Sequence, residues 1–150
     1  MRVVVQKVKN ASVKVNNRLV GKIKNGLVVL AGYESSDNSE DISWMVQKII
    51  KMRIFDDSEN KLNFSILDVN GEILLISQFT LHASVKKGNR PSYIKAADSK
   101  KAKQMYDQTI REFETLLKRK ISTGKFGANM EVSLVNNGPV TITIDSKKKE

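Results

Sequence analysis

The chain begins with a pattern of apolar positions that is typical of strands. Residues 2–8 alternate weakly and are rich in β-branched side chains, while residues 11–15 and 18–23 flank the dipeptide Asn16-Asn17. Such a dipeptide between apolar runs favours a two-residue type I′ hairpin turn. Residues 26–33 form a continuous apolar run, which indicates a buried strand.

The period of the apolar positions then changes to that of a helix. Over residues 39–53 apolar side chains recur every three or four positions. This spacing predicts an amphipathic helix, for which Asp37 or Ser39 is the expected N-cap. A second helix is predicted over residues 99–118, where a broad apolar stripe contains Ala102, Met105, Tyr106, Ile110, Phe113, Leu116 and Leu117.

Strand patterns outnumber helical ones over the whole chain. Residues 72–79 form a second buried apolar run, and residues 131–135 and 140–144 are the last predicted strands. Helices that interrupt runs of strands favour an α+β fold, with a largely antiparallel sheet or barrel-like core and two main helices. We expect a single domain over residues 1–150, with the basic end at 146–150 frayed in solvent.

Composition excludes several kinds of chemistry. The chain has no Cys and a single His, His82, which excludes disulfides and thiolate nucleophiles and argues against a metal site. We therefore expect no metal site. No apolar stretch approaches the roughly 20 residues of a membrane span, and no signal-peptide segment is visible. These features predict a cytoplasmic protein.

The charge balance favours a polyanionic partner. There are 26 basic and 16 acidic residues, which gives a formal net charge of +10. A compositional bias toward Lys explains this equally well. The distribution adds support for an anionic ligand, because cations at a helix start oppose the macrodipole. Cations gather at the start of the second predicted helix and in the loop before it: Lys86, Lys87, Arg90, Lys100, Lys101 and Lys103.

Polar side chains follow the buried run of residues 72–79. Ser77, Gln78 and Thr80 stand with Phe79 at the strand end, where groups are rigidly placed and accessible. Alternation predicts Ser77 and Phe79 on one face and Gln78 and Thr80 on the other. Their hydroxyl, amide and backbone N–H groups suit the stabilisation of an oxyanion. Alternatively, these residues simply end a strand.

Other candidates for catalysis are weaker. Thr80 and His82 share a face if the strand continues, but no third group that would orient a nucleophile–base pair is visible. The run Gly124-Lys125-Phe126-Gly127 lacks the phosphate-binding P-loop pattern. Asp56-Asp57 is interpreted as a solvated loop. An enzyme built from these parts has to act mainly by positioning and by backbone electrostatics.

The pair Gly138-Pro139 lies between two predicted strands. Proline removes a backbone donor, so the pair belongs at an edge, a bulge or a turn. Proline also makes a cis peptide accessible at about 0.5–1 kcal/mol. The simplest alternative is an ordinary hairpin turn.

In combination these segments resemble the D-aminoacyl-tRNA deacylase family, also called D-tyrosyl-tRNA deacylase. The resemblance extends through nearly the whole chain. The motifs that carry it, in this order and spacing, are residues 1–6 (MRVVVQ), 77–81 (SQFTL), 88–92 (GNRPS), 123–128 (TGKFGA), 130–135 (MEVSLV) and 137–141 (NGPVT).

The resemblance implies a homodimer that removes D-amino acids, and often glycine, wrongly esterified to tRNA, and that needs no metal and no organic cofactor. This is a proofreading reaction in translation, and its two active sites lie at the subunit interface. The family implies that a cis Gly138-Pro139 pair reaches from one subunit into the pocket of the other. It also implies a wall made of Ser77, Gln78, Phe79 and Thr80, and a pocket lined by Phe126, Met130 and Ala102.

Some roles stay open within this resemblance. Thr80 is a nucleophile candidate on chemical grounds, whereas the family is read as using backbone groups and the 2′-hydroxyl of the RNA. Relatives commonly carry Arg where this chain has Lys7, a residue that helps to fix the Gly-Pro pair, and His82 occupies a variable position. Two alternatives to a deacylase are an RNA-binding module without catalysis and a Thr80–His82 hydrolase of small esters.

Overall fold

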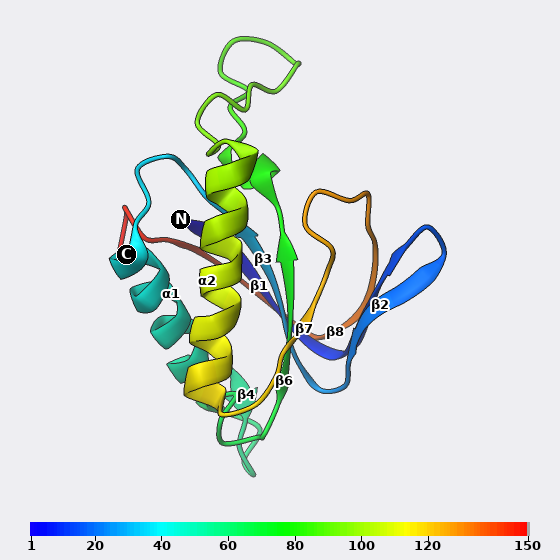
Figure 1. The fold of residues 1–150 in the computed structure, drawn as a ribbon. Helices are drawn as coiled ribbons and strands as arrows, with labels where there is room; N and C mark the ends of the chain where they lie inside the picture. Colours follow the sequence, from blue (N-terminus) through cyan, green and yellow to red (C-terminus); the bar gives the residue numbers. More distant parts are fainter. Residues whose placement is uncertain (150) are drawn as a thin grey trace.

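The computed structural model describes residues 1–149 and shows a curled, nearly closed sheet with two helices on one side (Figure 1). The strands are β1 (Arg2–Val15), β2 (Arg18–Ile23), β3 (Gly26–Gly32), β4 (Phe55–Asp56), β5 (Leu62–Phe64), β6 (Glu72–Ser77), β7 (Ser122–Thr123) and β8 (Glu131–Asp145). The helices are α1 (Ser39–Lys51), the 3₁₀ helix η1 (Phe79–His82) and α2 (Ser99–Leu117).

The main sheet has the order β2-β1-β3-β6-β7, with β8 also paired to β1. Strand β1 pairs antiparallel with β2, β3 and β8, whereas the β3–β6 and β6–β7 pairs are parallel. The Ser122 hydroxyl donates to the carbonyl of Lys22 at 2.8 Å, which brings β7 beside β2 and curls the sheet. The predicted α+β class and barrel-like core are confirmed, with a mixed sheet.

Strands β3 and β6 are buried on both faces, which explains their uninterrupted apolar runs. On one face Leu27, Val29 and Leu75 join a core with both helices. On the other face Val28 and Leu74 join a smaller core inside the curled sheet. Because both faces are covered, alternation between apolar and polar residues is absent. The sequence prediction of two buried strands is confirmed.

Helix α1 begins after Asn38, and the predicted cap at Asp37 or Ser39 is wrong by one residue. The Asn38 side chain accepts from the backbone of Glu40 and Asp41, and the Asp41 carboxylate accepts from the Asn38 N–H at 3.0 Å. This is a capping box. Asp37 instead forms a buried ion pair with the amino group of Met1. Helix α2 begins after Asp98, which caps the N–H of Lys101 at 3.0 Å.

The predicted hairpin turn at Asn16-Asn17 is confirmed. Both residues have positive φ, 49° and 61°, as a type I′ turn requires. Val15 faces Arg18 across the turn. The strands around it are longer than predicted, because β1 runs without a break from residue 2 to residue 15.

The segment that follows α1 is a short hairpin of β4 and β5, where the sequence predicted a solvated loop. The carboxylate of Asp57 accepts from the N–H groups of Glu59 and Lys61 and from the side chain of Asn63. Strands of two or three residues give no periodic pattern, so the sequence did not reveal them.

The basic end of the chain packs on α1, where we expected a frayed tail. Ser146 is buried, and Lys147 Nζ lies 2.6 Å from the carboxylate of Asp41. Lys149 Nζ lies 4.8 Å from the ring centroid of Trp44. Residue 150 lies outside the described residues. In the part of the chain that the structure describes, no helix is long and apolar enough to cross a membrane.

Candidate active site

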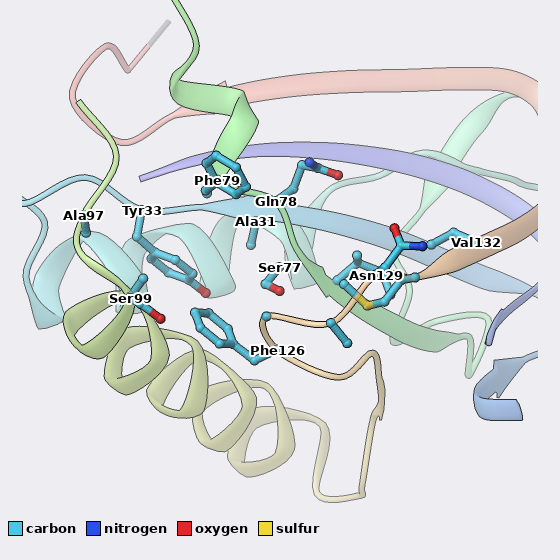
Figure 2. Close-up of a pocket in the computed structure, with 16 residues that line it drawn as sticks. Ala31, Tyr33, Ser77, Gln78, Phe79, Ala97, Ser99, Phe126, Asn129 and Val132 are labelled. Atoms are coloured by element: carbon cyan, nitrogen blue, oxygen red, sulfur yellow. The ribbon is translucent and has the colours of Figure 1, made fainter. Parts of the chain in front are cut away.

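A cavity of about 540 Å³ opens where the carboxyl end of β6 meets the first turns of α2 (Figure 2). The segment between β7 and β8 forms its remaining side. Six of the nine site residues expected from the resemblance line this cavity: Ser77, Gln78, Phe79, Ala102, Phe126 and Met130.

One wall is formed where β6 ends. The N–H of Gln78 donates to the carbonyl of Ala31 at 2.7 Å, and the chain then turns into η1. The strand geometry stops at Ser77, so the predicted alternation through Thr80 is wrong. Ser77 points toward Phe126 across the cavity (Figure 2). Phe79 is 56% exposed at the rim, where a ligand can contact its ring.

The start of η1 offers two free backbone donors. Among the described residues, the N–H groups of Phe79 and Thr80 have no hydrogen-bond acceptor. The side-chain amide of Gln78 donates to the Thr80 hydroxyl at 2.5 Å. Thr80 is half-buried and does not line the cavity. The free N–H of Phe79 thus belongs to a residue that lines the cavity, and the free N–H of Thr80 follows directly after it.

The opposite wall is anchored by two buried tyrosines. Tyr106 donates its hydroxyl to the carbonyl of Leu75 at 2.9 Å, and its ring lies 5.6 Å from that of Phe126. The hydroxyls of Tyr33 and Thr109 are 2.8 Å apart. Burial is the main cause that raises the pKa of both Tyr33 and Tyr106 above the ordinary range. Both hydroxyls are therefore neutral at physiological pH and act as structural anchors.

No Asp, Glu, His, Lys or Arg lies among the described residues that line the cavity. Its polar groups are the hydroxyls of Tyr33, Ser77 and Ser99, the amides of Gln78 and Asn129, and the backbone. None of these is a strong base at neutral pH. In the described part of the chain, no cluster of three or more His, Cys, Asp or Glu is placed to hold a metal. The site is thus suited to hydrogen bonding and positioning.

His82 lies behind the cavity wall and forms no pair with Thr80. Its side chain is 1% exposed, and its two ring nitrogens have no hydrogen-bond partner among residues 1–149. The nearest carboxylate oxygen, on Glu34, is 3.8 Å from Nδ1. The Thr80–His82 dyad that the sequence raised as an alternative is not assembled, because η1 replaces the extended backbone on which it depended.

The pair Gly138-Pro139 lies within β8 and is not a hairpin turn. Its peptide bond is cis, as predicted. In the pairing with β1, Thr141 faces Gln6 and Asn136 faces Val8. Residues 137–140, which we call the Gly-Pro segment, therefore bulge out opposite one residue of β1. Gly138 and Pro139 are exposed and do not line the cavity of their own chain.

Lys7 is the residue opposite the Gly-Pro segment, and it is only 2% exposed. Its Cε lies 3.9 Å from the place where a Cβ on Gly138 would stand, and its Nζ donates to the Asp56 carboxylate at 2.9 Å. Among the described residues Lys7 makes no hydrogen bond to the Gly-Pro segment. It supports the segment through its aliphatic stem, and its charge is directed to Asp56.

Sequence reasoning missed several residues of the site. Tyr33, Ser99 and Asn129 line the cavity but belong to no recognisable motif. Tyr33 follows β3, which pairs in parallel with β6. Carboxyl ends of neighbouring parallel strands lie at the same edge of a sheet, which is a common place for ligand sites. This signal needed the pairing of β3 with β6, and the sequence alone did not show it.

Comparisons with known proteins agree over nearly the full chain. A family model described as D-Tyr-tRNA(Tyr) deacylase matches residues 4–145. The chain is 54% identical over 150 residues to a D-aminoacyl-tRNA deacylase of Flavobacterium psychrophilum, with 100% of both chains covered. It is 52% identical over 148 residues to a D-aminoacyl-tRNA deacylase of Thermosipho africanus, with 99% of each covered.

Two solved structures share the fold. A protein described as c-Myc DNA unwinding element binding protein gives a TM-score of 0.92 at 37% identity, over 97% of this chain and 98% of that chain. A probable eukaryotic D-amino acid tRNA deacylase gives a TM-score of 0.82 at 18% identity, over 95% of this chain and 97% of that chain.

Proposed function

Since the chain belongs to the D-aminoacyl-tRNA deacylase family and is a hydrolase, we propose that it cleaves the ester between tRNA and a D-amino acid or glycine. We propose that the reaction takes place in the cytoplasm and needs neither a metal nor an organic cofactor. The observation that carries this proposal is a cavity whose lining has no charged side chain, with free backbone N–H groups at Phe79 in its wall and at the adjacent Thr80.

The chemistry requires little from side chains. An aminoacyl ester is already activated, and one oxyanion donor contributes roughly 2.7–4 kcal/mol to its transition state. The N–H groups of Phe79 and Thr80 are the proposed donors. Water attacks the carbonyl carbon, directly or with help from the 2′-hydroxyl of the RNA. The acyl–oxygen bond breaks, and the 3′-oxygen of the tRNA takes up a proton.

Chirality sets a harder requirement than hydrolysis. The two enantiomers of an amino acid carry the same groups, so rejection of one requires a clash. We propose that Gly138 and Pro139 of a second subunit enter the cavity and exclude L side chains. Their exposure, and their position outside the cavity of their own chain, support this arrangement. Glycine passes because it has no side chain to clash.

The central experiment compares hydrolysis of D-Tyr-tRNA and L-Tyr-tRNA by the purified protein. We expect release of D-tyrosine at least about 100-fold faster than of L-tyrosine, which corresponds to a difference of about 2.7 kcal/mol in activation free energy. Equal rates, or no release of either amino acid, would contradict the proposal. Binding of tRNA without release of D-tyrosine would instead support an RNA-binding module.

A mixing experiment tests whether two subunits share one site. Ala102→Phe fills the cavity and Gly138→Val alters the Gly-Pro segment, so each homodimer is expected to be inactive. A mixed dimer holds one site with an intact cavity and an intact segment. Statistical pairing after co-refolding should restore about a quarter of the wild-type activity. No recovery from a mixture shown to contain mixed dimers, or a wild-type protein that is strictly monomeric, argues against the shared site.

His82 distinguishes this proposal from a Thr80–His82 hydrolase. His82→Ala removes a buried side chain and is expected to lower stability by about 1–3 kcal/mol. Activity per folded molecule should stay within about threefold of the wild type, since the imidazole makes no hydrogen bond to Thr80 and is not among the lining residues of the cavity. Loss of nearly all turnover in folded protein would favour the hydrolase.

A further inference from the structure

We propose that residues 84–92, here called the basic loop, hold phosphates of the tRNA 3′ strand as it leaves the cavity, through Lys86, Lys87 and Arg90. This inference rests on the proposed function, because it assumes that the ligand of the cavity is the end of an RNA. It adds a second binding site to the one formed by the cavity.

The basic loop is a defined element of the fold. The backbones of Ser84 and Ser92 exchange two hydrogen bonds, of 2.8 and 2.9 Å, which close the base of the loop. The loop projects beyond the end of the sheet and the start of α2 (Figure 1). Because the Ser84–Ser92 pairing closes the loop at its base, Lys86, Lys87 and Arg90 are carried on the same projecting segment.

The charge of this region is uncompensated. All of residues 85–95 are exposed, and residues 83–97 contain no acidic side chain. Among the described residues Lys86, Lys87 and Arg90 take part in no ion pair or hydrogen bond. Lysines elsewhere do pair, as Lys103 does with Asp107 at 2.6 Å. Unpaired cations that share one surface attract a polyanion and steer its approach.

The basic loop is attached to the rim of the cavity. Tyr93, which follows the loop, contacts Phe79 edge to face, with ring centroids 5.0 Å apart. Ala97 lines the cavity, and its N–H donates to the carbonyl of Tyr33 at 2.9 Å. The segment from Tyr93 to Ala97 thus connects the loop to the cavity wall. A chain leaving the cavity at this rim passes close to the three cations.

A nucleic-acid strand is the occupant that fits these observations. An ester-linked amino acid in the cavity places the adjoining nucleotides outside it, and each nucleotide carries one phosphate. Lysine ammonium groups bind phosphate as point charges, and an arginine adds a bidentate contact. Each neutralised phosphate releases counterions, so the contribution of the loop should depend steeply on salt.

The test uses a triple variant, Lys86→Gln, Lys87→Gln and Arg90→Gln, with a matched control. The control replaces by Gln three lysines, Lys24, Lys51 and Lys118, which are exposed and take part in no ion pair among the described residues. They stand after β2, at the end of α1 and after α2, and these ends lie opposite the basic loop (Figure 1). Two substrates are compared, D-Tyr-tRNA and D-tyrosyl-adenosine, which has the same ester but no further nucleotides. Binding of uncharged tRNA is measured for all proteins between 50 and 200 mM salt.

For tRNA, three lost phosphate contacts should lower the slope of log K against log salt by about 2. Between 50 and 200 mM salt, the wild type should lose about 20-fold more affinity than the triple variant. The variant should also lose kcat/KM toward D-Tyr-tRNA at low salt, and keep it toward D-tyrosyl-adenosine. The control should retain the wild-type slope.

If the triple variant keeps the wild-type dependence of tRNA affinity on salt, the inference is wrong, and the loop would bind a different acidic partner. An equal loss in the control overturns it as well, because net charge alone would then explain the effect. A loss toward D-tyrosyl-adenosine would show that the substitutions disturb the cavity. If the wild type hydrolyses neither substrate, the proposed function fails, while the binding slopes still decide whether the loop holds RNA.

Discussion

The cavity beside Ser77 is enclosed by neutral side chains, whereas the Gly-Pro segment of β8 faces solvent above the ion pair of buried Lys7 with half-exposed Asp56. The cavity has space, hydroxyl groups and a free N–H at Phe79, but Gly138 and Pro139 are not among its lining residues. The Gly-Pro segment has a fixed backbone and no space of its own. Under the proposed function, the Gly-Pro segment can exclude L-amino acids only if it reaches into a cavity that would otherwise bind both enantiomers.

The two regions therefore complement each other, but they do not meet within one chain. Neither Gly138 nor Pro139 lines the cavity of its own chain. A second copy related by twofold symmetry would supply each cavity with the segment it lacks, and both sites would be completed at once. This separation is the physical argument for a dimeric enzyme. The predictions below disturb the cavity, the segment and the support of the segment in turn.

The largest effect is expected from filling the cavity. Ala102→Phe adds a ring to a wall residue that is 9% exposed, and we expect kcat/KM toward D-Tyr-tRNA to fall by at least about 100-fold. The control is Gln104→Phe, an exposed position on the same helix, which should leave activity unchanged. Both proteins are compared by enzyme kinetics and thermal unfolding. A folded Ala102→Phe protein with normal activity would place the reaction elsewhere.

A smaller effect is expected from the Gly-Pro segment. Gly138 has a φ of +130°, and a Cβ there would lie 3.1 Å from the backbone nitrogen of Val140. Gly138→Ala should lower the free energy of unfolding by about 1–3 kcal/mol and kcat/KM by about 10-fold. Asn17→Ala is the matched control, since Asn17 also has positive φ, 61°, but lies in the exposed turn between β1 and β2 and does not line the cavity. It should lose stability alone; an equal loss of activity would contradict a special role for Gly138.

The ion pair of Lys7 and Asp56 supports the Gly-Pro segment, and removing its two charges one at a time should lower the free energy of unfolding by different amounts. Asp56→Asn leaves the ammonium of Lys7 buried without a counter-ion and should cost about 2–3 kcal/mol of unfolding free energy. Lys7→Met keeps the stem beside Gly138 and leaves a carboxylate whose side chain is 43% exposed, so we expect about 1 kcal/mol. Denaturant unfolding of both variants and the double variant gives the coupling energy. A larger loss for Lys7→Met would contradict this account.

The smallest effect is expected from acid and acts on Asp57, the neighbour of Asp56 in the β4–β5 hairpin. The backbone N–H of Lys61 is the largest cause that lowers the pKa of Asp57, and Glu59 and Asn63 lower it further. A depressed pKa in the folded state means that Asp57 stabilises the protein above its unfolded pKa of about 3.9. That contribution is lost as the pH falls through the folded value. Asp57→Asn should therefore reduce stability at pH 7 and flatten its decline toward pH 3. An acid decline identical to that of the wild type would contradict it.

The parts of the fold that the sequence predicted are those with a long periodic pattern. The runs at β3 and β6, and the stripes of α1 and α2, each extend over enough residues to distinguish strand from helix. The Asn16-Asn17 turn was readable because its backbone requires positive φ at both positions. These signals are local, and each depends on neighbours in the chain.

The parts that escaped prediction depend on contacts between distant segments. Lys7 and Asp56 are 49 residues apart, and nothing in either local sequence indicates their ion pair. The cap of α1 shifted by one residue because Asp37 binds Met1. Of the polar run that was predicted as a wall, Ser77, Gln78 and Phe79 line the cavity and Thr80 does not. The turn into η1 that separates them depends on the bond from Gln78 to Ala31. Residues that form the cavity without a motif, such as Tyr33, required the parallel pairing of β3 with β6.

The Gly-Pro segment also affects the tendency of the protein to aggregate. Among the described strands β8 pairs only with β1, so its outer edge presents peptide groups over residues 131–145. Such an edge is a template for strands of other chains and promotes aggregation. Pro139 has no backbone N–H, and the bulge at residues 137–140 interrupts the exposed peptide groups near the middle of β8. The same four residues therefore protect the sheet from adding foreign strands, so a variant with a straight β8 would tend to form insoluble assemblies.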